Sequence, residues 1–148
     1  MALSEGKSVN GKKEGYWVTY FANGHTRSEG AYKQGTKDGK WIQYYKNGKI
    51  SSKGHFKNGD FEGWYVCYYE NGHKKWAGDY GPHVGKSYDG KKEGEWKCYA
   101  AIDGKTVWRT ITYKHGTRTK PDEFLLGPCA MCGSPIHEPD ADLCPDCL

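Results

Sequence analysis

Hydrophobic and polar residues alternate over short stretches of the chain, and one such stretch recurs. Residues 41–45 read Trp-Ile-Gln-Tyr-Tyr, an aromatic and branched composition that is typical of a strand. The Asn-Gly dipeptide at 47–48 tolerates positive φ at both centres of a tight hairpin turn, and residues 50–57 form a second expected strand before the Asn-Gly at 58–59. The pattern predicts a β-hairpin over residues 39–62.

The hairpin repeats with a period of 24 residues, which predicts a repeat architecture. Gly15, Gly39 and Gly63 open three successive units, and Gly94 opens a fourth after a gap of 31 residues. The first residues match the second half of a unit. We therefore expect nine strands, one in the half unit 4–14 and two in each of the units 15–38, 39–62, 63–93 and 94–119.

Aromatic residues are expected on both faces of this sheet, because side chains alternate faces along a strand. We expect most of these rings to hold the sheet together by cross-strand contacts. The alternative is that one face is a binding groove, since one curved sheet does not bury two aromatic faces unless something covers the second. We call these faces the Tyr face, with Tyr20, Tyr44, Tyr68 and Tyr99, and the Trp face, with Trp17, Trp41, Tyr65, Trp96, Tyr45 and Tyr69. The alternative places the binding groove on the Trp face.

The second strands of the first three units carry a glycine two positions before an aromatic residue. The position is Gly30, Gly54 or Gly78 in the first three units and Ile111 in the last. A glycine inside a strand marks a close approach of another group to the backbone. We expect an aromatic ring from a neighbouring strand to lie across it.

The motif G-x-W-x-x-Y-Y-x-N-G, followed by G-x-Y-K-x-G-x-x-x-G, is clearest at residues 15–24, 39–48 and 63–72. It resembles the MORN repeat (membrane occupation and recognition nexus), and most closely the bacterial variant of YwqK-type antitoxin repeats. The resemblance covers about residues 4–119. It implies an all-β fold, an elongated and twisted antiparallel sheet of stacked hairpins, used as a scaffold or binding surface. The fourth unit departs from the motif at residues 100–102, as terminal cap repeats often do.

The charges divide the chain into two modules. All 22 Lys and Arg residues lie in residues 1–120 with 12 of the 18 acids, whereas residues 121–148 hold six acids and no Lys or Arg. The first region is therefore strongly basic and the second acidic. Residues 1–119 are expected to form the repeat sheet and residues 129–148 a separate module, joined by a linker at 120–128.

The second module carries two C-x-x-C pairs, which in a cytosolic chain indicate a metal site before a disulfide. Four thiolates complete a tetrahedral shell for structural Zn²⁺ and leave no open position for catalysis. The segment resembles the short zinc ribbons found at the ends of many prokaryotic proteins. The expected ligands are Cys129, Cys132, Cys144 and Cys147.

The other two cysteines, Cys67 and Cys98, occupy equivalent positions of consecutive units. One intervening strand should separate them by about 9–10 Å, since neighbouring strands lie about 4.8 Å apart. A disulfide needs Cα atoms within about 7 Å. We therefore expect both to be reduced packing residues.

Two segments interrupt the repeat pattern. The insertion at residues 81–87 ends in Gly-Lys-Ser but lacks the spacing, the preceding parallel strand and the following helix of a phosphate loop. We expect a surface loop there, with His83 and Lys86 as candidate contact residues. Residues 119–123 look like a helix start, and residues 124–126 like the apolar face of a short helical turn that docks on the open end of the sheet.

The favoured function is a non-catalytic binding scaffold that recognises a partner protein, with an antitoxin-like inhibitor of a toxin or effector as its specific form. Binding of nucleic acid or anionic lipid through the basic aromatic sheet is the alternative. Much of the Lys content lies in the turns beside acids and favours a solvated rim. A homo-oligomer is a further alternative.

Catalysis is not expected from the sequence. The six His residues are scattered, and no carboxylate pair or nucleophile–base pair has a telling spacing. The N-terminal residues have no apolar run, so neither a secretory signal nor a membrane span is expected, which favours the cytoplasm.

Overall fold

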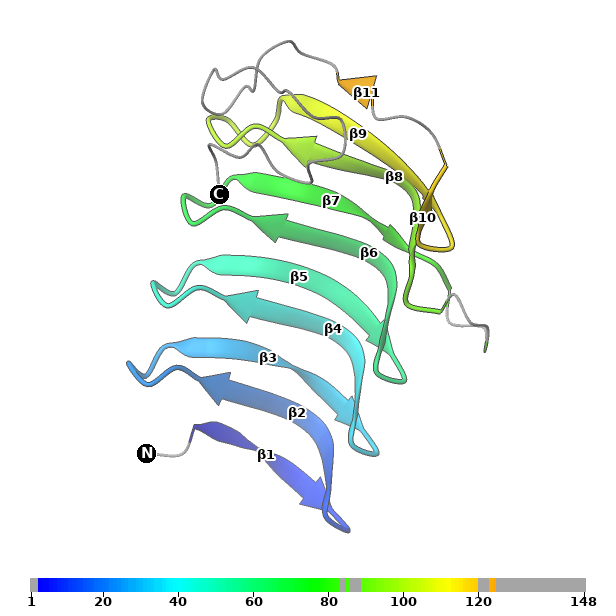
Figure 1. Ribbon diagram of the computed structural model, residues 1–148. Helices are drawn as coiled ribbons and strands as arrows, with labels where there is room; N and C mark the ends of the chain where they lie inside the picture. The colour runs from blue at the N-terminus through cyan, green and yellow to red at the C-terminus, as the bar shows by residue number, and fades with distance from the viewer. Residues whose placement is uncertain (1–2, 83–84, 86–88, 120–122, 125–148) are drawn as a thin grey trace.

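A computed structural model describes residues 3–82, 85, 89–119 and 123–124, and the strands among these residues form one open antiparallel sheet. Consecutive strands are neighbours from β1 to β10, and β11 pairs with β9 (Figure 1). The described residues contain no helix, and the predicted all-β hairpin repeat is confirmed for them. The strands are β1 (Ser4–Val9), β2 (Lys12–Tyr20), β3 (Thr26–Lys33), β4 (Thr36–Tyr44), β5 (Ile50–Lys57), β6 (Asp60–Tyr68), β7 (Lys74–Tyr80), β8 (Lys92–Tyr99), β9 (Val107–Lys114), β10 (Thr117–Arg118) and β11 (Glu123–Phe124).

The glycines that were predicted to open each unit lie inside strands, at the points where the strands bend. β4 begins at Thr36, and Gly39 lies within it with a φ of 78°. The pairing shifts at this point, because Gly30 faces Trp41 whereas Ala31 faces Asp38. A β-bulge of this kind bends the strand, and Figure 1 shows the outer end of each hairpin turning away from the main plane. Gly15, Gly63 and Gly94 repeat the positive φ. A unit of the structure is therefore one hairpin, and the four units in order are β2–β3, β4–β5, β6–β7 and β8–β9.

Outer and inner turns use different chemistry. In the outer turn at 34–35, Gln34 and Gly35 both have positive φ, and the turns at 10–11, 58–59 and 115–116 repeat this. In the inner turn Gly48 has positive φ and Asn47 does not. The prediction of a two-residue turn with positive φ at both 47 and 48 is therefore wrong.

The inner turn is a three-residue loop. The Tyr45 N–H donates to the Lys49 carbonyl at 2.7 Å, and the Gly48 N–H donates back to the Tyr45 carbonyl at 2.9 Å. The Asn47 side chain accepts from the Lys49 N–H at 3.0 Å. Asn47 therefore contributes its side-chain oxygen to the turn, and only Gly48 adopts the left-handed conformation. This arrangement is typical of hairpins with a Gly bulge.

Inner turns of neighbouring units are linked by side chains. The Lys46 carbonyl accepts hydrogen bonds from Asn23 Nδ2 at 3.0 Å and from His25 Nδ1 at 2.6 Å. Asn71 and His73 hold the Ala101 carbonyl in the same way, at 2.9 and 2.6 Å. The inner turn of the fourth unit therefore still stacks on the third, although its sequence departs from the repeat.

The inner turn of the fourth unit is closed by its own acid. Asp103 accepts hydrogen bonds from the Thr106 hydroxyl and from the N–H groups of Lys105 and Thr106. These bonds, the Thr106 hydroxyl first, lower the pKa of the Asp103 carboxyl to about 2. Ala100, at the start of this turn, is fully buried. The turn is therefore a well-bonded variant of the repeat.

The last edge of the sheet is covered by short strands. β10 pairs with β9 after the His115-Gly116 turn, and β11 pairs with Arg109 and Thr110 further along the same strand. The predicted helical turn is wrong at residues 123–124, because these residues pair with the exposed edge of β9 instead of closing on themselves. The rest of the linker, at 120–122 and 125–128, lies outside the described residues.

The two sheet cysteines, Cys67 and Cys98, are reduced thiols, as predicted. Trp76 faces Cys67 on one side and Cys98 on the other, so one strand separates the two thiols. Burial raises the pKa of the Cys67 thiol to about 12. Cys67 is therefore a packing residue with little thiolate character.

Candidate binding face

Aromatic rings lie flat on the glycines of the preceding strand. A Cβ atom added at Gly30 would lie 2.4 Å from Trp41 Cδ2, and Gly6 and Gly78 meet Trp17 and Trp96 at 2.3 and 2.4 Å. At Gly54 the nearest atom belongs to Tyr65, at 2.9 Å. The predicted role of these glycines is confirmed.

Each Trp ring is also fixed by its nitrogen. Trp41 Nε1 donates to the Ala31 carbonyl at 2.9 Å, Trp17 Nε1 to the Lys7 carbonyl at 3.0 Å, and Trp96 Nε1 to the Asp79 carbonyl at 3.1 Å. The three side chains are only 9%, 2% and 1% exposed for Trp17, Trp41 and Trp96. The candidate contact residues with Trp rings thus form the core of the sheet, and Tyr65 is half-buried beside them.

The sheet makes this core by folding over itself. Rings from the bent outer ends meet the Trp rings edge-on, as Tyr32 does to Trp41 with centroids 5.0 Å apart and planes at 82°. Such T-shaped pairs are favourable beyond their burial, by about 0.5–1.5 kcal/mol each. Successive contacts give a continuous aromatic ladder: Trp17, Tyr32, Trp41, Phe56, Phe61, Tyr65, Tyr80, Trp96 and Tyr113.

Three lysines cover the ladder, and we call them the lysine row: Lys13, Lys37 and Lys92. Lys37 Nζ lies 4.4 Å from the Trp41 centroid, and Lys13 and Lys92 lie 4.5 and 4.6 Å from the Trp17 and Trp96 centroids. Burial, and then the charge of Lys13, lower the pKa of Lys37. These lysines were expected in a solvated rim, and that expectation is wrong for them, because the strands begin earlier and bend inward.

The third unit exchanges both partners of this contact. Phe61 stands where the other units have the lysine, and Tyr65 where they have Trp. Phe61 stacks on Tyr80 at 4.6 Å with planes at 13°, and its ring meets Tyr65 edge-on at 5.3 Å. The contacting residues are four positions apart in every unit, as Lys-x-x-x-Trp or as Phe-x-x-x-Tyr. This spacing was visible in the sequence and could have predicted the contact.

Tyr45 and Tyr69 join consecutive units. The Tyr45 hydroxyl donates to the Tyr68 carbonyl at 2.6 Å, and the Tyr69 hydroxyl donates to the Tyr99 carbonyl at 3.3 Å. Both side chains are half-buried. Their hydroxyls are used within the sheet, so only the ring faces are available for a partner.

The Tyr face is more open than the Trp face. Tyr16 is 60% and Trp64 43% exposed there. The Tyr44 hydroxyl donates to Glu29, and burial, followed by this hydrogen bond, raises the pKa of Tyr44 to about 12. The two aromatic faces are therefore unequal, with the core on the Trp face.

The other predicted site residues are not placed by the structure. His83 and Lys86 lie outside the described residues, and so do Cys129, Cys132, Cys144 and Cys147. Within the described part of the chain, no group of three or more His, Cys, Asp or Glu side chains could hold a metal ion. Among the same residues, no helix has the length and apolar character needed to cross a membrane.

Comparison with known proteins identifies the first two full hairpins. A family model described as the MORN repeat variant matches residues 13–34 and 37–58. Each match spans one lysine of the row, the Trp that it covers and the following strand. No curated protein matches the chain. The chain is thus a repeat protein with two segments similar to MORN repeats.

Proposed function

We propose that the chain is a non-catalytic binding scaffold whose Trp face recognises a partner protein through the lysine row. The observation that carries this proposal is the placement of the three ammonium groups on the aromatic ladder. A part-buried cation interacts more strongly with an anion than an exposed one does, because the local dielectric is lower. The lowered pKa of Lys37, from burial and from Lys13, means that a carboxylate between these two lysines would be stabilised.

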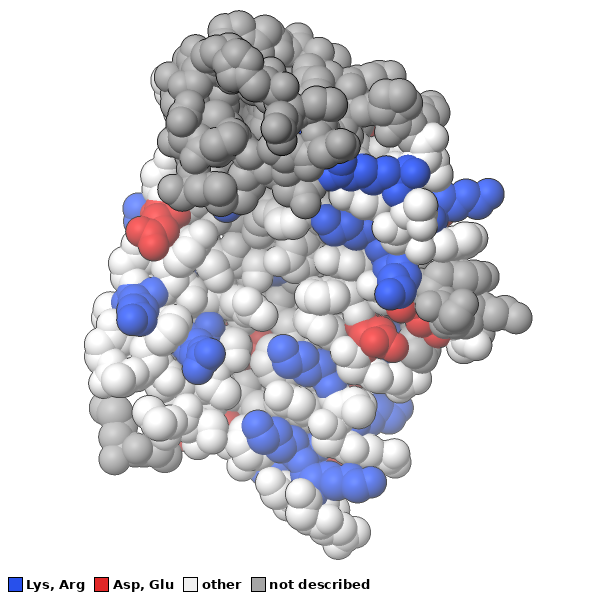
Figure 2. Space-filling model, in the orientation of Figure 1, with Lys and Arg blue, Asp and Glu red and all other residues white. Residues whose placement is uncertain are grey.

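The pattern of the row favours a protein over a uniform polyanion. Equivalent lysines of adjacent units lie two strands apart, at about 9–10 Å. The third unit interrupts the row with Phe61, which packs between Phe56 and Tyr80. Figure 2 shows separate groups of Lys and Arg side chains with uncharged surface between them. A protein segment can alternate acidic and apolar side chains to match, whereas a phosphate backbone cannot.

Binding of nucleic acid or anionic lipid is the second candidate. It is favoured by the 22 Lys and Arg residues against 12 acids in residues 1–120. Aromatic rings beside cations also suit base stacking. This class predicts a steep loss of affinity between about 50 and 200 mM salt, because each neutralised phosphate releases counterions.

Two finer forms belong to the same proposal. An antitoxin-like inhibitor would bind a toxin or effector protein with the Trp face. Identifying the captured partner tests this hypothesis directly. A homo-oligomer would use the open edge of β1, whose residues Ser4–Val9 are all exposed. Mass measurement in solution separates a self-associated chain from a chain bound to another protein.

Removing the charge of two row lysines tests the proposal. In the double variant Lys13→Met, Lys37→Met the side-chain stems still cover the rings, but the ammonium groups are gone. We expect capture of the partner from nuclease-treated native lysate, in about 0.5 M salt, to fall at least about tenfold, since hydrogen bonds to charged groups contribute about 1.5–3 kcal/mol each. Quantitative mass spectrometry of the captured proteins provides the measurement.

The matched control is Lys33→Met, Lys57→Met, which removes the same charge from exposed positions of the same two units. Its capture should equal that of the unaltered chain. Equal capture by both double variants would contradict the proposal. Capture that disappears with nuclease or salt would instead establish the polyanion class.

We also propose that residues 129–148 bind one structural Zn²⁺ through the four cysteines. The support is the pair of C-x-x-C knuckles, whose thiolates suit tetrahedral Zn²⁺. Cys132→Ser is expected to abolish stoichiometric zinc binding, seen by native mass spectrometry, and to leave the melting of the sheet unchanged. A combined loss of zinc and of the sheet's melting transition would refute the division into two modules.

A further inference from the structure

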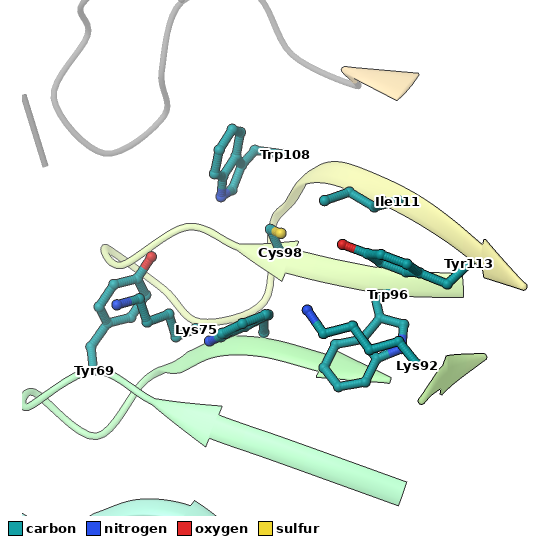
Figure 3. A pocket seen from close by; sticks show the side chains of 9 residues that line it. Tyr69, Lys75, Lys92, Trp96, Cys98, Trp108, Ile111 and Tyr113 are labelled. Carbon is teal, nitrogen blue, oxygen red and sulfur yellow. The ribbon is translucent and has the colours of Figure 1, made fainter. Parts of the chain in front are cut away.

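A small cavity lies beside the Trp face where β7, β8 and β9 meet. Its volume is about 130 Å³, and its lining includes the ring of Trp76. The rings of Trp96, Trp108 and Tyr113 also line it (Figure 3). An engineered apolar cavity of about 150 Å³ holds a benzene molecule. The space therefore fits one six-membered ring.

One wall of this cavity carries a donor without an acceptor. Trp108 is only 4% exposed, and its Nε1 finds no hydrogen-bond partner among the described residues. The buried Trp rings of the ladder differ, because Trp17, Trp41 and Trp96 all donate to backbone carbonyls. Figure 3 shows the Trp108 nitrogen directed into the cavity. A buried N–H without a partner is unfavourable, so a ligand that accepts this bond gains the difference.

The cavity is also electropositive. Lys75 and Lys92 belong to its lining, and the described lining residues include no Asp or Glu. Lys92 Nζ lies 4.3 Å from the Trp76 centroid, and Lys75 Nζ lies 5.4 Å from the Tyr69 centroid. Both cations are thus held beside the rings. An acceptor with negative charge is favoured over a neutral one.

We propose that this cavity binds a six-membered aromatic ring that carries a carboxylate. The ring packs among the indoles, and the carboxylate accepts from Trp108 Nε1 and pairs with Lys75 and Lys92. The same chemistry is offered by a free aromatic acid and by an aromatic residue at the carboxyl end of a protein. The cavity shares Lys92 with the lysine row, but Trp108 and Lys75 are not members of the row, so variants of these two residues test the cavity separately from the partner-binding function.

Binding of benzoate to the full chain tests it, with toluene and acetate as the ring-only and charge-only probes. We expect benzoate to shift the indole N–H resonance of Trp108 and to bind at least about tenfold more tightly than toluene or acetate, because only benzoate makes both contacts. Equal affinities for benzoate and toluene, or an unmoved Trp108 resonance, would overturn the proposal. N-acetylphenylalanine and its amide identify the source: tighter binding of the acid than of benzoate indicates a protein terminus, and weaker binding a free acid.

Two variants separate the contacts. Lys75→Met should weaken benzoate binding about tenfold and leave toluene binding unchanged, since it removes one polar contact, and Trp108→Phe, which also removes part of the apolar wall, should weaken benzoate binding more than toluene binding. Lys75→Met keeps the test valid if Trp108→Phe fails to fold. The control Trp64→Phe alters an exposed Trp outside the cavity and should change neither affinity. Unchanged benzoate binding in Lys75→Met and in a folded Trp108→Phe would overturn the proposal.

Discussion

Replacing Gly30 with Ala is expected to lower the free energy of unfolding by about 2–3 kcal/mol, although Ala is ordinarily the better residue in a strand by about 0.5–1 kcal/mol. The reason is the Trp41 ring, which lies across the glycine. The added Cβ would fall 2.4–2.6 Å from three atoms of the ring, closer than real Cβ contacts come. Trp41 is held in place, because its nitrogen is bonded to the Ala31 carbonyl and the rings of Tyr32 and Phe56 pack edge-on against it. Chemical denaturation measures the change.

Gly54→Ala is the matched control for this prediction. It occupies the same repeat position, but its new Cβ would come within 3 Å of one atom only, Tyr65 Cδ2 at 2.9 Å, with Phe61 next at 3.4 Å. This overlap is shallower and involves one ring atom instead of three, so we expect a change within about 0.5 kcal/mol, as the strand preference for Ala offsets the contact. Equal losses at both positions would mean that the ring contact does not decide the stability.

The repeat and the role of its glycines were predictable because both follow from local rules. A strict period, turn dipeptides and side-chain alternation required the hairpins, and a glycine in front of an aromatic residue required a ring across it. Ile111 supports the same logic. No strand with a Trp follows β9 in the described chain, so that position tolerates a large side chain.

The bend in the sheet could not be predicted in this way. Gly39 was taken as the start of a unit because turn glycines and bulge glycines look alike in a sequence. Its positive φ inside β4 bends the strand, which brings Lys37 onto Trp41 and gives a single sheet its own core. The bent outer ends of the hairpins therefore cover the Trp face, and this follows from the geometry of the β-bulges and not from the composition.

The inner turns and the last edge were mispredicted for a related reason. Asn47 was assigned a backbone role, but its side chain bonds to Lys49 instead. At residues 123–124 the local sequence favours a helix, but the edge of β9 offers backbone N–H and C=O groups that need partners. A strand pairs with these groups directly, and residues 123–124 form that strand. In both places a bond to a neighbouring segment determines the conformation.

Trp41→Ala is expected to cost about 3–5 kcal/mol of stability, the usual range for removing a buried Trp. The residue is 2% exposed and lies at the centre of the ladder, so its loss opens a cavity between Gly30, Tyr32 and Phe56. Trp64→Ala, which removes the 43% exposed Trp of the Tyr face, should cost about 1 kcal/mol or less. Thermal and chemical denaturation of both variants provide the comparison. Full stability in Trp41→Ala with loss of partner binding would instead make Trp41 a contact residue.

The third unit supplies a rescue that tests the cause. Trp41→Tyr alone leaves Lys37 above a smaller ring, whereas Lys37→Phe with Trp41→Tyr recreates the Phe61 and Tyr65 pair in the second unit. If the ladder is built from matched pairs, the double variant should be more stable than Trp41→Tyr by about 1 kcal/mol, a coupling that residues in direct contact commonly show. Additive losses would show that the two positions act independently. Recovery to the stability of the unaltered chain would mean that an apolar pair supports the fold as well as the Lys and Trp pair does, so that the fold alone does not require the lysine row.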